Sequence, residues 1–323
     1  MEDLDYYALS RLFGAKMVPM KAPVFGHFGI LEVTAEAAKV LHAPQKEKPR
    51  FTVSQEKLIV QTFEKIREGF PPEALQWNSE ILRQFVKACR KAGLDFSQED
   101  LVRRLQTIRK NPNKYARLGI KIKPATRKEH TEGVAVFAPV IEFALVRLRY
   151  RYGISIDEIL IDRGLGAELE KLVQACVPEL SPQQIRLAAL SLRKKRFLPK
   201  NRKQSVQRLR SDRLEQTWSP LRPLATLDLS SIPRCGGIVE LRQGSRDLYV
   251  SRNDDLHGVL EFLHNSKPLS LMASPFWTPN LNEIETRFIP ETTLDPAKLE
   301  KWELKLLTER KPNFNWPIST RAA

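Results

Sequence analysis

The feature that most constrains the fold is a change in the spacing of apolar residues near residue 224. Before it, over residues 51–197, apolar side chains recur at steps of three and four, which predicts amphipathic helices. After it, the sequences GIVELR at 237–242 and DLYVS at 247–251 flank a Gly-containing turn, the pattern of a β-hairpin. The chain therefore combines a helical part with a part built on a sheet.

Local helix signals support the first half of this division. Apolar runs over 58–66 and 75–89 are followed by Gly69 and Gly93, which predicts two helices that stop at these glycines. Ser97 precedes Asp100 by three residues, the spacing of a capped helix start. Pro182 stands at the first position of another predicted helix. We expect a mainly helical domain here.

Residues 154–172 allow a second interpretation, a helix-turn-helix with Gly164 and Gly166 in its turn. The second helix of that motif would carry Glu168, Glu170 and only Lys171. A recognition helix needs donors for phosphates and base edges, so this is the weaker interpretation.

Positive charge is concentrated before residue 224. The chain has 53 Lys and Arg against 38 Asp and Glu, a net charge of +15, of which residues 1–224 carry +16 and residues 225–323 carry −1. Such an excess favours nucleic acid, DNA in the first place, as the partner of the helical part. A second basic stretch, from Arg103 to Lys128, would widen the same surface.

The densest basic run follows the predicted helix that begins at Pro182. We expect it to contact phosphates, through Arg193, Lys194, Lys195, Arg196, Lys200, Arg202, Lys203, Arg208 and Arg210. Two alternatives stay open. The run is also typical of a solvated helix end and flexible linker, and the charge would also suit an acidic protein or RNA.

Other features bear on the compartment. Three lone cysteines, an acidic N-terminal segment and the lack of an export signal lead us to expect a cytoplasmic protein. The longest apolar stretch, residues 133–146, is interrupted by Pro139 and Glu142 and is shorter than the roughly 18–20 residues of a membrane span. We therefore expect no membrane contact, and nothing in the sequence specifies an oligomeric state.

Beyond residue 224 the predicted order is strand, strand, helix, strand, helix. The triplet Gly237-Ile-Val239 lies in the first strand and Tyr249-Val-Ser251 in the second, and Glu303 on the last helix precedes the segment Pro312–Asn315. In this order and spacing, residues 225–318 resemble the GIY-YIG nuclease domain, which implies a three-stranded antiparallel sheet.

The resemblance also implies a chemistry, metal-dependent hydrolysis of a DNA phosphodiester. Glu303 would hold Mg²⁺ or Mn²⁺, Tyr249 would orient or deprotonate the attacking water, and Arg252 or His257 would contact the phosphate. Gly237 would support the site. Asn315 would also support it, more by holding the terminal segment to the backbone than by catalysis.

Departures from the family pattern leave an alternative open. Val239 stands where the family has a tyrosine, Val259 where it has an arginine, and Ser251 where it has a glycine. Two expected catalytic residues are therefore missing. The alternative is a non-catalytic module that retains the nuclease fold and contacts DNA or protein.

The sequence thus predicts an α+β multidomain protein. Its parts are an N-terminal extension (1–50), a helical, basic, nucleic-acid-binding domain (51–197), a basic, proline-containing linker (198–224), a GIY-YIG-like domain (225–318) and a tail (319–323).

Overall fold

The structure, a computed structural model, describes most of the chain after residue 48. The described residues are 17–19, 28–30, 49–127, 134–195, 217–265, 268–272, 280–292 and 296–315.

 Of the nine basic residues predicted to contact phosphates, Arg193, Lys194 and Lys195 are described, and the other six lie outside the described residues.

The described elements are mostly helices. The α-helices are α3 (Val53–Ile66), α4 (Ala74–Trp77), α5 (Ser79–Lys91), α6 (Gln98–Lys110), α7 (Pro112–Ala116), α8 (Ala138–Tyr152), α9 (Ile156–Ile161), α10 (Arg163–Gln174), α11 (Pro182–Lys195), α14 (Leu256–His264) and α15 (Pro296–Arg310). Short 3₁₀ helices are η2 (Ala135–Phe137), η3 (Leu224–Thr226), η4 (Leu229–Ser231), η5 (Pro268–Met272) and η6 (Leu281–Glu283). The strands are β1 (Met17–Pro19), β2 (Phe28–Ile30), β3 (Arg222–Pro223), β4 (Gly237–Gln243), β5 (Arg246–Asn253) and β6 (Ile284–Pro290).

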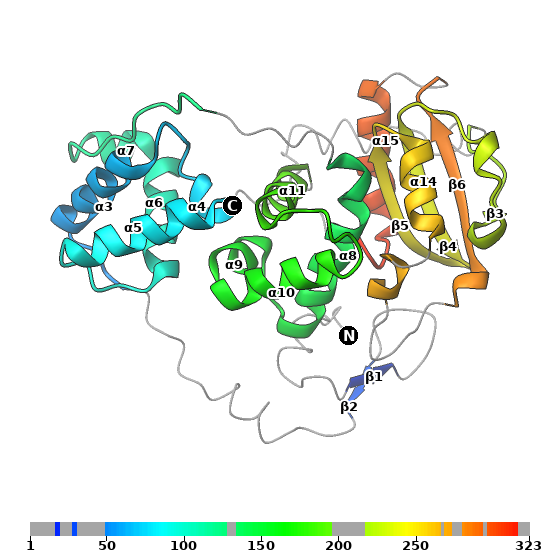
Figure 1. Ribbon diagram of the computed structural model, residues 1–323, viewed down its shortest axis with the longest axis horizontal. Coiled ribbons are helices and arrows are strands. Elements are labelled where there is room, and N and C mark those ends of the chain that lie inside the picture. Colours follow the sequence, from blue (N-terminus) through cyan, green and yellow to red (C-terminus); the bar gives the residue numbers. More distant parts are fainter. Residues whose placement is uncertain are drawn as a thin grey trace.

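Three groups of elements lie side by side (Figure 1). We call α3–α7, residues 49–127, the first helical lobe and η2 with α8–α11, residues 134–195, the second helical lobe. The sheet domain, residues 217–315, holds β3–β6, α14 and α15. The second helical lobe lies between the other two, and the chain is mixed α and β.

Side-chain caps mark the starts of α3, α5 and α6. Thr52 and Gln55 form a capping box at α3, so this helix starts just before the Ser54 expected from the sequence. The run predicted as one helix over 75–89 is two, because Asn78 leaves the helical conformation and accepts hydrogen bonds at the start of α5. The predicted cap at Ser97 is confirmed.

The proposed helix-turn-helix does not form its turn at the two glycines. Gly164 and Gly166 lie inside α10, which starts at Arg163 and is capped by Asp162. The junction between α9 and α10 is therefore Asp162 itself.

The order of elements predicted beyond residue 224 is confirmed: β4, β5, α14, β6, α15. The sheet is antiparallel with strand order β3-β6-β4-β5, so it has four strands rather than the three expected. The additional strand is β3, in which Arg222 pairs with Thr286 and Pro223 with Glu285. It lies in the stretch predicted to be a linker, and its proline is tolerated because β3 is an edge strand.

Helices cover both faces of this sheet. On one face, Ile238, Val250 and Ile289 pack with Leu299 and Trp302 of α15. On the other face, alternate residues of the same strands pack with α14 and with the second helical lobe. Residues that are neighbours in a strand are thus buried against different helices.

The apolar core continues from the second helical lobe into the sheet domain. Phe143 of α8 lies edge-on to Tyr249 and Phe314, with ring centroids 4.9 Å and 6.4 Å away, and Phe137 lies 5.3 Å from Phe262. The predicted domain boundaries stay a prediction. Within the described residues, no helix is long and apolar enough to cross a membrane.

Candidate nucleic-acid interface

Tyr249, the predicted water-orienting residue, lies in the core. Its side chain has no exposed surface, and its ring packs edge-on against Phe143. Strand residues alternate between faces, so Tyr249 lies on the face opposite to α15, which carries Glu303.

The structure brings Glu303 and Arg252 together through the backbone. Oε1 of Glu303 accepts a hydrogen bond from the backbone N–H of Arg252 at 3.2 Å, and Glu303 is 7% exposed. The Arg252 guanidinium lies 3.8 Å from Asp254 instead. Glu303 therefore forms a hydrogen bond with the backbone at the edge of β5.

Asn315 forms hydrogen bonds with the same edge of β5 at Val250, two residues before Arg252. Its side-chain amide accepts from Val250 N–H at 2.8 Å and donates to Val250 C=O at 2.7 Å. The backbone N–H groups of Asn313 and Phe314 donate to the carbonyls of Asp247 and Leu248. The expectation that Asn315 holds the terminal segment to the backbone agrees with these contacts.

The other residues of the resemblance are placed by packing. His257, in the first turn of α14, lies 3.9 Å from Glu261. A side chain at Gly237 would collide with the carbonyl of Ile289 and with Leu256, so glycine is required for this close approach. Val239 and Val259 are fully buried apolar residues.

The fit of Mg²⁺ or Mn²⁺ can be tested on the same residues. A hard cation needs several oxygen ligands. Among the described residues, no group of three or more His, Cys, Asp or Glu side chains lies close enough to hold a metal ion. Among the described residues, Glu303 therefore lies in no cluster of side-chain ligands of this kind, and its Oε1 is bonded to Arg252 N–H.

The described start of the predicted basic run lies at the end of α11. Lys194 and Lys195 are exposed, and Arg193 forms an ion pair with Asp157 of α9. The remaining predicted contacts lie outside the described residues: Arg196, Lys200, Arg202, Lys203, Arg208 and Arg210.

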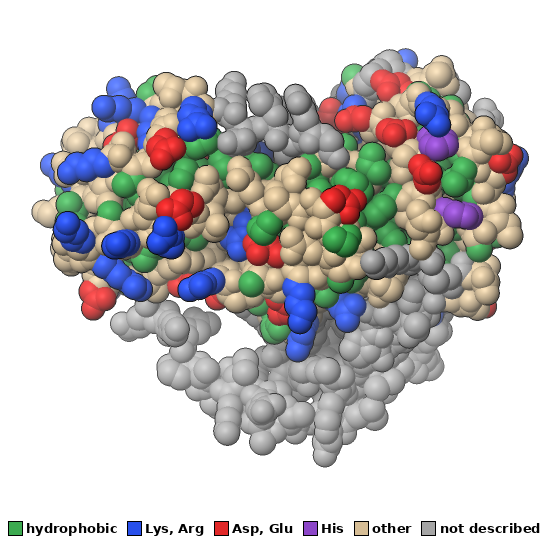
Figure 2. Space-filling view, in the orientation of Figure 1, with side chains coloured by type: hydrophobic (Ala, Val, Ile, Leu, Met, Phe, Trp, Pro, Cys, Tyr) green, Lys and Arg blue, Asp and Glu red, His purple; other side chains and the backbone are tan. Residues whose placement is uncertain are grey.

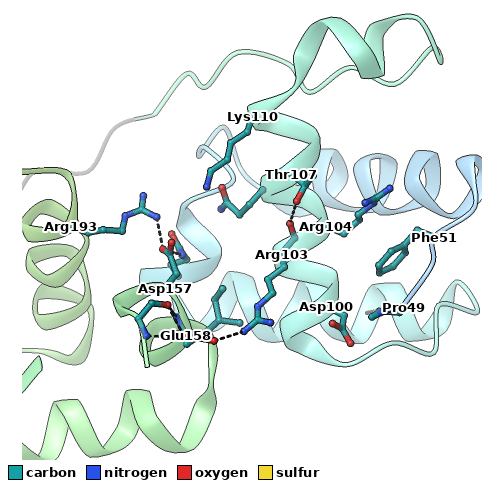
Figure 3. Close-up of a pocket in the computed structure, with 14 residues that line it drawn as sticks. Pro49, Phe51, Asp100, Arg103, Arg104, Thr107, Lys110, Asp157, Glu158 and Arg193 are labelled. Carbon is teal, nitrogen blue, oxygen red and sulfur yellow. Dashed lines mark hydrogen bonds and ion pairs between the residues drawn. The ribbon is translucent and has the colours of Figure 1, made fainter. Parts of the chain in front are cut away.

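Arg193 lines a cleft of about 430 Å³ that we call the α6–α9 cleft. Figure 3 shows Arg103 reaching from α6 to Glu158 and Arg193 reaching from α11 to Asp157. Arg104 is paired with Glu56. Three of the four cations that line this cleft are thus neutralised by carboxylates, and Lys110 is the fourth.

The basic stretch that begins at Arg103 is partly neutralised in the same way. Besides Arg103 and Arg104, Arg109 is paired with Glu73 at 2.7 Å, and Arg127 lies 3.5 Å from Glu68. Four basic residues of this stretch therefore have carboxylate partners, three in the first helical lobe and one, Glu158, in the second.

A second cleft, of about 660 Å³, separates α5 from α10 and α11, and we call it the α5–α10 cleft. Five cations line it: Arg83, Lys87, Arg90, Arg163 and Arg186. Glu80 is the one carboxylate among its described lining residues. Figure 2 shows Lys and Arg side chains gathered over the first helical lobe, including the surface over α5.

Glu80 neutralises only one of these cations. Its carboxylate accepts hydrogen bonds from Arg83 and Gln84, which lower its pKa below the ordinary value and keep it charged. Lys87, Arg90 and Arg163 are exposed, and each is without an ion-pair partner in the described part of the chain. This cleft therefore offers unneutralised positive charge.

The sequence predictions missed this cleft. Arg83, Lys87 and Arg90 recur at steps of four and three, which places them on one side of α5. That spacing was available as a signal. Their position opposite Arg163 and Arg186 could not be predicted from the sequence, because it depends on how α5 packs against α10 and α11.

Comparisons with protein families, with curated proteins and with solved structures found no match to this chain. The resemblance to the GIY-YIG nuclease domain therefore stays a prediction that rests on the residues and the order of elements.

Proposed function

We propose that this protein binds nucleic acid without cleaving it, and that the nucleic-acid strand lies in the α5–α10 cleft. The observation that carries the proposal is the set of unpaired cations, Lys87, Arg90 and Arg163, on opposite walls of one cleft. Cations placed along a groove attract the phosphate backbone, which supplies most of the affinity of sequence-independent binding.

The charge of the surrounding lobe supports this assignment. Residues 49–127 contain 17 Lys and Arg against 8 Asp and Glu, whereas residues 217–315 contain 12 against 13. A polyanion approaching the molecule is therefore drawn to the first helical lobe rather than to the sheet domain.

The character of the cleft favours phosphates over bases as the groups recognised. None of its described lining residues is aromatic, so no stacking platform for bases is present among them. Contacts made only to the backbone predict little dependence on base sequence.

The absence of cleavage is proposed from the sheet domain. Tyr249 is buried, and Glu303 is bonded to the backbone of β5. Val239 and Val259 occupy the positions where the family has the tyrosine of the first triplet and the helix arginine, and both are fully buried. These four residues are placed as parts of a folded core.

The binding test compares two triple variants by fluorescence anisotropy with a 20-nucleotide DNA, single-stranded and duplex, over a salt series. Lys87→Ala/Arg90→Ala/Arg163→Ala removes three cleft cations. The matched control, Lys57→Ala/Lys65→Ala/Lys171→Ala, removes three exposed lysines outside the cleft.

We expect the cleft variant to lose at least about tenfold in affinity and to show a salt slope shallower by about 2–3. The control variant should stay within about threefold of the wild type. Equal losses in the two variants would refute the cleft as the binding site.

The cleavage test is plasmid nicking with Mg²⁺, with Mn²⁺ and with EDTA, for the wild type and Glu303→Gln. The glutamine keeps an acceptor for Arg252 N–H. We expect no metal-dependent nicking from either protein. Nicking by the wild type that disappears in Glu303→Gln would show an active nuclease instead.

A further inference from the structure

Arg186 differs from the other cations of the α5–α10 cleft because it is buried and hydrogen-bonded to residues of α9 and α10. It belongs to α11 and is 7% exposed. Its Nε donates to Glu170 at 2.5 Å and its Nη1 to the carbonyl of Leu160 at 3.2 Å. These two contacts fix the plane of the guanidinium.

The fixed guanidinium retains donors. A guanidinium has five N–H groups, and the contacts with Glu170 and Leu160 use one at Nε and one at Nη1. No described residue accepts a hydrogen bond from Nη2 of Arg186, a residue that lines the cleft.

Gly166 makes room for this arrangement. A Cβ at this position of α10 would lie 2.9 Å from Cζ of Arg186 and closer still to Nη2. Glycine inside a helix makes that helix less stable than alanine would. The close approach of the guanidinium gives a physical reason for the glycine.

We propose that Arg186 is a preset ligand for a phosphate group in the α5–α10 cleft, with Gly166 as the residue that lets its guanidinium reach that position. The inference rests on the proposed function, and it names the group recognised. A guanidinium with free N–H groups at Nη1 and Nη2 can bind phosphate oxygens through charge-assisted hydrogen bonds. Arg163, which lines the same cleft, adds a second positive charge.

Three single variants test the inference, each with the 20-nucleotide DNA and with inorganic pyrophosphate, by anisotropy and by calorimetry. Arg186→Gln removes the guanidinium. Glu170→Gln removes the same ion pair but keeps the guanidinium. Gly166→Ala keeps every charge and displaces the guanidinium. The thermal midpoint of each variant is measured in parallel.

We expect Arg186→Gln to weaken binding of both probes by about tenfold or more, and Gly166→Ala to weaken it severalfold. Glu170→Gln should bind as tightly as the wild type or more tightly, because it removes a competing carboxylate. If Arg186 had only a structural role, Glu170→Gln and Arg186→Gln would lose affinity alike, and that result would overturn the inference.

The two probes separate this inference from the proposed function. DNA binding that is unchanged in Arg186→Gln and Gly166→Ala refutes the phosphate ligand and leaves the function in place. Pyrophosphate binding that depends on Arg186, with no binding of DNA, refutes the function and supports the ligand. Binding of neither probe by the wild type overturns both.

Discussion

The sheet domain and the α5–α10 cleft use their polar residues in opposite ways. At the edge of β5, Glu303 and Asn315 bond to backbone groups. In the cleft, Lys87, Arg90 and Arg163 have no ion-pair partner among the described residues. The difference teaches that a residue in a catalytic-looking position can be used by the fold, while an ordinary helix surface keeps groups available for a ligand.

The sharpest separation of the two regions is expected from Asn315→Ala. Val250 loses both hydrogen-bond partners on its outer side, so we expect a loss of about 2 kcal/mol in the free energy of unfolding, measured with urea. Asn313→Ala is the matched control, because Asn313 contributes its backbone N–H to the edge. Its loss should be under about 0.5 kcal/mol. If Asn315→Ala lowered DNA affinity by more than its unfolded fraction explains, the binding site would lie on the sheet domain.

The two clefts can be compared through one lysine each. Lys87 lines the α5–α10 cleft and Lys110 the α6–α9 cleft, and both are exposed. Lys87→Glu should weaken DNA binding by about tenfold, because it replaces an attraction with a repulsion, and Lys110→Glu by less than about threefold. The measurement is anisotropy at one salt concentration. The reverse order would move the site to the α6–α9 cleft.

Removing the carboxylate partners of its arginines should give the α6–α9 cleft unneutralised cations, as in the α5–α10 cleft. Asp157→Asn/Glu158→Gln removes the partners of Arg193 and Arg103. The glutamine preserves the capping box with Ser155. We expect DNA affinity to rise by about three- to fivefold, with a steeper salt dependence. No gain would mean that pairing does not limit binding there.

The smallest expected effect concerns Cys89, which should react with a thiol reagent at a rate near zero. Burial raises the pKa of the Cys89 thiol to about 12, and Cys89 lies on the buried side of α5. At pH 8 roughly one thiol in ten thousand is then ionised, so Cys89 should not react with N-ethylmaleimide while Cys176 and Cys235 do. Mass spectrometry identifies the modified residues. Labelling of Cys89 in a cleft variant would reveal that α5 has lost its packing.

Much of the fold could be predicted because its signals are local. The order of β4, β5, α14, β6 and α15 follows from alternation, turn residues and helix periodicity. β3 was missed because two residues, one of them proline, show no alternation. The start of α10 was missed because Gly164 and Gly166 disfavour a helix, and the packing of Arg186 over Gly166 is visible only in three dimensions.

The candidate site was less predictable for the same reason. The interval between Glu303 and Asn315 could be read from the sequence, but which groups these side chains contact depends on how closely α15 and the terminal segment approach β5. Likewise, the charges of Arg103 and Arg193 were counted as available. Their neutralisation by Glu158 and Asp157 requires α9 to lie between α6 and α11.

The closed edge of β5 has a consequence for self-association. An exposed strand edge is a template on which another chain can add a strand, and this is a common route to aggregation. Here the outer groups of β5 are occupied by residues 303 and 313–315, and the opposite edge is the two-residue strand β3 with its proline. A chain shortened before residue 313 would leave β5 open, and we expect it to aggregate where the full chain stays dispersed.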